Sequence, residues 1–290
     1  MIAAPASDFT ELVLHCLAHL RSPGPEDVFD AGYVEWVGHH APTAHLAALD
    51  VGLGRLQRHW STGKVPVVVQ AWPELFPTIA AFREVGPGPL KSLAPSQVAG
   101  ASVLGWLQRA DETIVESVHA TLLELMPTFE GWHRDVVRPQ LSAAMQSTAP
   151  WLEQAVQLMP SLAQRTIEQT SALGRHGRGL PSRILIGAAL PFNGLEPQVP
   201  AILALHEESV HRAGSGDYHE VEWRALVGLT HRMQGAEPSL RAAHAQWLSS
   251  LNLVSVLDAA VARDELDAAG RQQLLAEPLA RAQRLLTLGG

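Results

Sequence analysis

The chain has 290 residues, of which 47% are hydrophobic and 17% are charged. This composition is typical of a folded protein with a substantial core, and it excludes a disordered or low-complexity chain. The formal net charge is −8 at pH 7, which is the wrong sign for binding a phosphate backbone, so we expect no nucleic-acid partner. Cys16 is the single cysteine, which excludes an intramolecular disulfide and a zinc site built from thiolates.

The N-terminal segment does not resemble a secretory signal, because it has no basic region and carries Asp8 and Glu11 ahead of its apolar positions. Apolar runs such as 184–190 are far shorter than the roughly 20 residues that span a bilayer. We therefore expect a cytoplasmic protein with no membrane partner. Only Lys64 and Lys91 are lysines among 21 basic residues, and this preference for arginine indicates a bacterial source with a GC-rich genome.

Helical spacing of apolar residues dominates the first half of the chain. Asp8 and Glu11 are expected to cap a helix that ends before the Pro/Gly-rich segment 22–25, and a leucine stripe predicts a second helix over 43–60. Residues 65–71 have the composition of an edge strand, whereas Pro73 could start a helix that reaches residue 83. Residues 86–95 form a domain boundary or a long loop.

A long helix is predicted from residue 96 to Met126, where Pro127 should end it. Shorter helices should follow, separated by prolines 139, 150 and 160. The apolar run 183–190 is predicted to be a strand, and it follows a glycine-rich break at 174–181. Helices are expected over 197–212, from Asp217 to about 234, from Pro238, and over 271–288.

These patterns predict a mostly α, multi-helix globular fold with at most one or two short strands, around 65–71 and 183–190. Residues 1–86 would form an N-terminal helical region. Residues 96–290 would form a larger helical region that carries the candidate site, although both could belong to a single domain. The oligomeric state is not indicated by any pattern in the sequence.

Metal-ligand side chains are densest around the helix predicted over 197–213. His206, Glu207, Glu208 and His211 lie within six residues of an otherwise apolar helix, and Asp217, His219, Glu220 and Glu222 follow it. Burying such groups without partners is expensive, so a bound ion or a hydrogen-bonded network is expected. The candidate ligands of a divalent zinc or iron ion are His206, Glu208, His211, His219 and Glu222, and the candidate catalytic carboxylates are Glu207 and Glu208.

The spacing of the two histidines narrows the possible ligand sets. His206 and His211 lie about 140° apart around a regular helix, so a shared ion would need a one-residue bulge between them. Their H-E-x-x-x-H spacing is similar to that of the dipeptidyl peptidase III family. That family's second acidic motif is absent from this sequence, so its activity is not carried over.

A second ligand pattern, Glu-x-x-His, places a carboxylate and an imidazole on one helix face. It occurs at Glu208–His211, at Glu116–His119 and at 130–133. Two such pairs make half of a helical di-iron site, so an alternative is a di-iron oxidase that uses Glu116, His119, Glu208 and His211. Glu84 and Glu168 would then supply the other carboxylates. By contrast, His39, His40 and His45 are interpreted as a surface cluster.

The strand predicted at 183–190, followed by a helix bearing acids and histidines, resembles the edge-strand and active-site-helix pair of zinc-dependent hydrolases. This resemblance implies a metal-dependent enzyme that acts on a small-molecule or peptide substrate, and an iron ion in the same place would imply an oxygenase. The other alternative is a non-catalytic helical partner or regulatory protein, in which the polar cluster only stabilises the fold.

Overall fold

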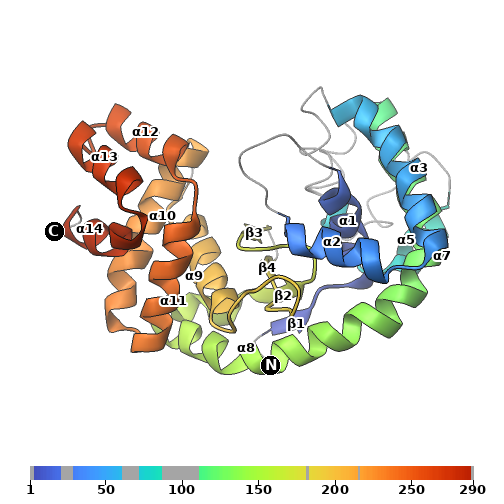
Figure 1. Ribbon diagram of the computed structural model, residues 1–290, viewed down its shortest axis with the longest axis horizontal. Coiled ribbons are helices and arrows are strands. Elements are labelled where there is room, and N and C mark those ends of the chain that lie inside the picture. The colour runs from blue at the N-terminus through green and yellow to red at the C-terminus, as the bar shows by residue number, and fades with distance from the viewer. Residues whose placement is uncertain are drawn as a thin grey trace. The chain divides into compact units, whose positions relative to one another are not determined.

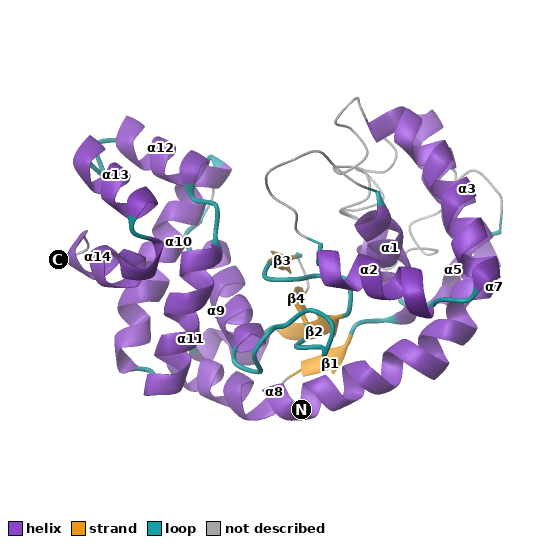
Figure 2. Cartoon of the chain, viewed as in Figure 1, coloured by secondary structure: helices purple, strands orange, loops and turns teal. Residues whose placement is uncertain are grey.

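The computed structural model describes residues 3–20, 29–60, 72–86, 111–180, 183–214 and 216–288. These residues form a mostly α structure (Figure 2), which confirms the predicted fold class. The chain divides into two compact units. The N-terminal unit comprises residues 5–142 and 170–173, and the C-terminal unit comprises residues 1–4, 143–169 and 174–290. The boundary or loop predicted at 86–95 lies almost entirely outside the described residues.

The described part of the N-terminal unit contains five complete α-helices, a 3₁₀ turn (72–74) and a π turn (133–137) (Figure 1). The helices are α1 (Asp8–His19), α2 (Ala31–His40), α3 (Thr43–Trp60), α5 (Ile79–Val85) and α7 (Glu112–Trp132). Their starts are fixed by short polar side chains that accept backbone N–H groups, such as Asp30 at α2 and Asp111 at α7. The cap of α1 is Ser7 rather than Asp8, whose carboxylate instead accepts the N–H groups of Phe9 and Ile79.

The prediction that prolines separate the helices of residues 112–158 is wrong. α7 continues through Pro127, passes into a π turn over His133–Val137, and is followed directly by α8 (Arg138–Leu158), which contains Pro150. In the π turn the Arg138 N–H donates to the carbonyl of His133, five residues earlier. This shift of the hydrogen-bond register just before Pro139 gives the ring room that a regular helix would deny it.

The C-terminal unit contains most of a small sheet whose strand order is β1-β2-β4-β3 (Figure 1). The strands are β1 (Ala3–Pro5), β2 (Thr166–Thr170), β3 (Gly177–Gly179) and β4 (Arg183–Gly187). The strand predicted at 183–190 is confirmed as β4, whereas the one predicted at 65–71 lies outside the described residues. The described sheet therefore has more strands than expected, because β1, β2 and β3 are too short or too polar to show strand periodicity.

Six helices complete the C-terminal unit: α9 (Val199–Arg212), α10 (Tyr218–Arg232), α11 (Pro238–Ser250), α12 (Val254–Ala262), α13 (Ala268–Ala276) and α14 (Arg281–Leu288). α9 ends before Gly214, whose φ of +92° lies in the left-handed region, and Asp217 caps α10 as predicted. The single helix predicted over 271–288 is wrong, because a 3₁₀ turn beginning at Pro278 separates α13 from α14. None of the helices in the described part of the chain is long and apolar enough to cross a membrane.

The close packing of α3 against α7 in the N-terminal unit can be tested by substituting two glycines of α3. A Cβ atom at Gly52 would lie 2.5 Å from Cγ2 of the fully buried Thr121, whereas one at Gly54, two residues along α3, would meet nothing within 4 Å. Gly52→Ala should therefore lower the free energy of unfolding by about 1–3 kcal/mol. Gly54→Ala should raise it by up to about 1 kcal/mol, because alanine favours the helix. Urea unfolding of both variants measures the difference, and equal effects would show that α3 and α7 do not pack this closely.

Candidate functional site

One buried histidine lies between two carboxylates where α9 packs on α10. Nε2 of His206 is 3.0 Å from Oε1 of Glu222, and Nδ1 of the same ring is 3.5 Å from Oε1 of Glu207. The three side chains are 8 to 12% exposed. The structure therefore brings together three of the residues predicted for the site, and it does so through two helices that are sequence neighbours.

The charges in this cluster are strongly coupled. Burial alone lowers the pKa of His206, but the carboxylates of Glu222 and Glu207 outweigh it and raise that pKa to about 10. Burial raises the pKa of Glu222, but His206, together with His176 and His219, reverses this and lowers it. The neighbouring His244 has its pKa lowered to about 4, first by burial and then by the charge on His206. At neutral pH, His206 is therefore a cation and His244 is neutral.

Two members of the cluster keep a buried polar atom without a hydrogen bond. These atoms are Oε2 of Glu222 and Nδ1 of His219, both within the described part of the chain, whereas Nε2 of His206 is occupied by its ion pair with Oε1 of Glu222. His219 and Glu222 lie three residues apart on α10 and so share a face. Other buried histidine nitrogens, such as Nε2 of His119, also have no partner. His206, His219 and Glu222 differ from these because Glu222 interacts electrostatically with both histidines.

Glu207 is held by the edge of the sheet. Its Oε2 accepts the Gly179 N–H at 2.6 Å, and a Cβ atom at Gly177 would lie 2.6 Å from its Cγ. The Leu180 N–H donates to the Arg183 carbonyl, so in this antiparallel pair the Gly179 N–H points away from β4. The Glu207 carboxylate therefore occupies the outward-facing edge of β3, and the glycine at 177 allows its side chain to approach.

The other predicted ligands of α9 lie apart from this cluster. Glu208 is buried, and its Oε2 is 3.8 Å from Nε of Arg165. His211 is exposed, and α9 is a regular α-helix over 199–212, without the bulge that a shared ion with His206 would need. Among the described residues, no group of three or more His, Cys, Asp or Glu side chains is arranged as a preformed metal site.

The pairs considered for a di-iron site are also separated by their surroundings. Glu116 is exposed, whereas His119 is buried with its ring 5.3 Å from that of Phe82. Glu130 forms an ion pair with Arg83, and His133 stacks on Phe129 with 4.9 Å between ring centroids. These residues belong to the N-terminal unit, and neither pair presents its carboxylate and imidazole together.

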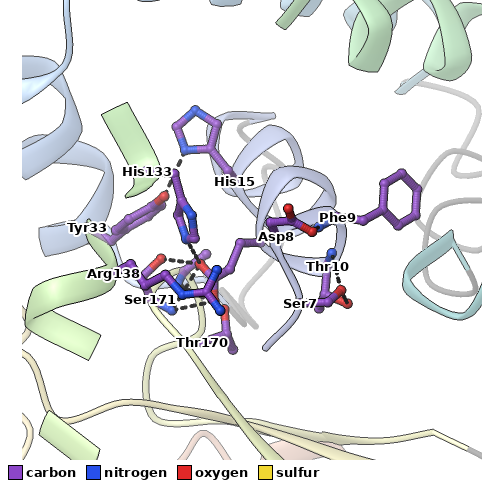
Figure 3. Close-up of polar contacts among 12 residues, drawn as sticks. Ser7, Asp8, Phe9, Thr10, His15, Tyr33, His133, Arg138, Thr170 and Ser171 are labelled. Atoms are coloured by element: carbon purple, nitrogen blue, oxygen red, sulfur yellow. Dashed lines mark hydrogen bonds and ion pairs between the residues drawn. The ribbon is translucent and has the colours of Figure 1, made fainter. Parts of the chain in front are cut away.

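The sequence analysis missed a second polar cluster, in the N-terminal unit (Figure 3). Glu11 of α1 is fully buried and accepts both the backbone N–H and the hydroxyl of Ser171, at 3.1 and 2.5 Å. His15, one turn later, bonds Tyr33 and His45. The interpretation of His45 as a surface residue is wrong, because it is fully buried. The available signal was the polar pair Glu11 and His15 on the apolar helix 8–19.

Comparison with family models, with curated proteins and with solved structures finds no significant match. The function is therefore inferred from the residues and their geometry.

The coupling between His206 and Glu222 can be measured directly. In Glu222→Gln the pKa of His206 should fall well below 10, because the closest opposing charge is removed while burial remains. Titration of the imidazole signals by NMR gives this value. Glu220→Gln is the matched control on α10, since Glu220 pairs with Arg224 and Arg263 instead. An unchanged pKa of His206 in Glu222→Gln would contradict the described contact.

Proposed function

We propose that this protein is a metal-dependent enzyme whose zinc or iron ion is bound by His206, His219 and Glu222. The observation that supports this proposal is that Nδ1 of His219 and Oε2 of Glu222 are buried without a hydrogen bond, while His206 pairs with the same Glu222, on two helices packed together. Two imidazoles and one carboxylate are the ligand set of several zinc hydrolases and of non-haem iron oxygenases. The proposal requires these side chains to move, since they are not arranged as a preformed site.

Glu207 is the proposed catalytic carboxylate, because it contacts the ring of His206 and is not itself a proposed ligand. A bound divalent ion would make a water molecule acidic enough to give up a proton near neutral pH. Glu207 would accept that proton after its side chain rotates, because its carboxylate now accepts the Gly179 N–H and contacts Nδ1 of His206, on the opposite side of the ring from Nε2. Glu208, the other acid predicted as catalytic, is instead oriented toward Arg165.

Binding of the ion would compete with a proton. His206 is a cation in the metal-free protein, since its pKa is raised to about 10. A metal ion binds the neutral imidazole, so each bound ion would release the proton from Nε2. Loading is therefore expected to improve as the pH rises from 6 to 8.

The second candidate is a non-catalytic helical partner or regulatory protein in which the same residues only stabilise the fold. Two contacts favour it: the ion pair of His206 with Glu222, and the hydrogen bond from Gly179 to Glu207. Together they connect α9, α10 and β3 without any ligand. The two candidates differ in whether the cluster retains an ion.

Metal content separates the two candidates. The untagged protein is incubated with zinc or with ferrous iron, freed of unbound ion by gel filtration and analysed by mass spectrometry. We expect about one ion per chain in the wild type. His219→Ala should retain less than about a tenth of it, because the variant loses a ligand. The fold should be preserved, because Nδ1 of His219 makes no hydrogen bond that the substitution would remove.

His211→Ala is the matched control, since His211 is exposed on α9, and it should bind the ion like the wild type. Circular dichroism verifies that each variant is folded. Retained zinc would direct the search to hydrolysis of peptides and small esters, and retained iron to oxygen consumption. A folded wild type that retains no ion, or a His219→Ala variant that retains as much as the wild type, would refute the proposal in favour of a structural cluster.

A further inference from the structure

A continuous chain of buried hydrogen bonds crosses the N-terminal unit. Nδ1 of His15 lies 2.8 Å from the Tyr33 hydroxyl, Nε2 of His15 lies 2.9 Å from Nε2 of His45, and Nδ1 of His45 lies 2.9 Å from Oγ1 of Thr128. The four residues come from α1, α2, α3 and α7. This chain therefore connects four helices of the unit through side chains alone.

The direction of each of these hydrogen bonds follows from the Thr128 end of the row. The Thr128 hydroxyl donates its single hydrogen to the Leu125 carbonyl, at 3.0 Å, so Oγ1 must accept from Nδ1–H of His45. Nε2 of a neutral His45 is then an acceptor, and Nε2 of His15 must donate to it. Nδ1 of His15 is left as an acceptor for the Tyr33 hydroxyl. With both histidines neutral, this is the one arrangement of protons that satisfies the whole set of contacts.

Protonation is incompatible with this arrangement. A second proton on His45 would sit on Nε2 and face the N–H of His15 across 2.9 Å. A second proton on His15 would sit on Nδ1 and face the hydroxyl hydrogen of Tyr33. In this order of protons, either case sets two donors against each other, and in any order it buries a charge among other histidines, which is costly without an opposite charge.

The charged and titratable groups around the two rings do not compensate for a buried cation. From α1 itself, His19 packs 4.6 Å from the His15 ring, and from the π turn, His133 also disfavours a charge on His15. Glu11 is an acid on the same helix as His15, but its carboxylate accepts from Ser171 and lies 3.8 Å from His133. Asp8 and Arg138 act on His133 with opposite signs. Among the described residues, the His15 ring also packs against the rings of Phe129 and Trp132.

We propose that the chain Tyr33–His15–His45–Thr128 is an acid-sensitive lock, which holds α1, α2, α3 and α7 together at neutral pH and releases them when its histidines take up protons. Burial, reinforced by the neighbouring histidines, holds the pKa of His15 well below its usual range. The pKa of His45 is lowered to about 4, mainly by burial and then by His19. This device is independent of the proposed metal site, which lies in the other unit.

The sign of the pH dependence follows from these shifts. The histidines of the lock have a lower pKa folded than unfolded, where it is about 6.5. Their contribution to stability is therefore complete above pH 6.5 and is lost as the pH falls from 6.5 toward 4. Each proton taken up on opening multiplies the opening equilibrium constant by about ten per pH unit, so two histidines give about a hundredfold.

Hydrogen exchange of the full-length protein, corrected for the intrinsic pH dependence of exchange, measures this opening. Peptides from α1 and α3 should lose protection between pH 6.5 and 4.5 more steeply than peptides from α9 and α10. In His45→Gln the amide replaces the donor and the acceptor of the ring without titrating. With one titrating histidine instead of two, its opening constant in α1 and α3 should therefore change by about tenfold per pH unit, compared with about a hundredfold in the wild type.

Tyr33→Phe is the matched control for stability, because it removes a hydrogen bond of the same chain but no group that titrates in this range. It should open more readily at every pH and keep the steep dependence. His40→Gln, which changes an exposed histidine of α2, should behave like the wild type. An unchanged slope in His45→Gln would overturn the proposal. If that variant does not fold, the wild type alone still tests the proposal. The proposal would be overturned if peptides from α1 and α3 lost protection no more steeply than peptides from α9 and α10.

Discussion

The need to give buried polar groups a partner is the constraint on which both units of this protein depend. A buried donor or acceptor without a partner costs about 1–3 kcal/mol, and an unpaired charge costs more. Each unit nevertheless buries histidines and a glutamate in an apolar interior. The two units meet this constraint in different ways, and the difference indicates what each cluster does.

In the N-terminal unit the histidines at the centre are kept neutral. His15, His45 and Thr128 each use a donor and an acceptor in one consistent order that begins at the Tyr33 hydroxyl, so this cluster contains hydrogen bonds but no histidine charge. In the C-terminal unit, by contrast, His206 is held as a cation between two carboxylates. An ion pair satisfies its charge, yet Nδ1 of His219 and Oε2 of Glu222 remain without hydrogen bonds. A neutral, ordered set of hydrogen bonds suits a structural lock, whereas unpaired polar atoms beside a buried ion pair suit the binding of a metal ion.

The sequence predicted the parts of this structure that depend on local interactions. The helix over 43–60 and the cap at Asp217 follow from apolar periodicity and from a single side chain, and both are confirmed. The grouping of His206, Glu207 and Glu222 could also be expected, because α9 and α10 are neighbours in sequence. The prolines at 127 and 150 were misread, because a proline ends a helix only where the surrounding packing does not hold the helix together.

Contacts between distant residues could not be predicted in this way. The partners of Glu11 and His45 lie 160 and 83 residues away, at Ser171 and Thr128, and no spacing rule connects them. The short strands β1 and β3 owe their existence to pairing rather than to their own sequences, which carry no alternation. The spacing of His211 from His206 is similar to that of a ligand motif, but exposure and helix rotation separate His211 from the cluster.

The central claim is that His206, His219 and Glu222 bind one metal ion. Crystals grown with zinc, and separately with ferrous iron, would test it most directly through anomalous difference maps at each absorption edge. The account predicts a single strong peak at the α9–α10 contact, about 2.0–2.2 Å from Nε2 of His206, Nδ1 of His219 and a carboxylate oxygen of Glu222. A map without a peak there, in which His206 remains paired with Glu222 at 3.0 Å, would contradict it.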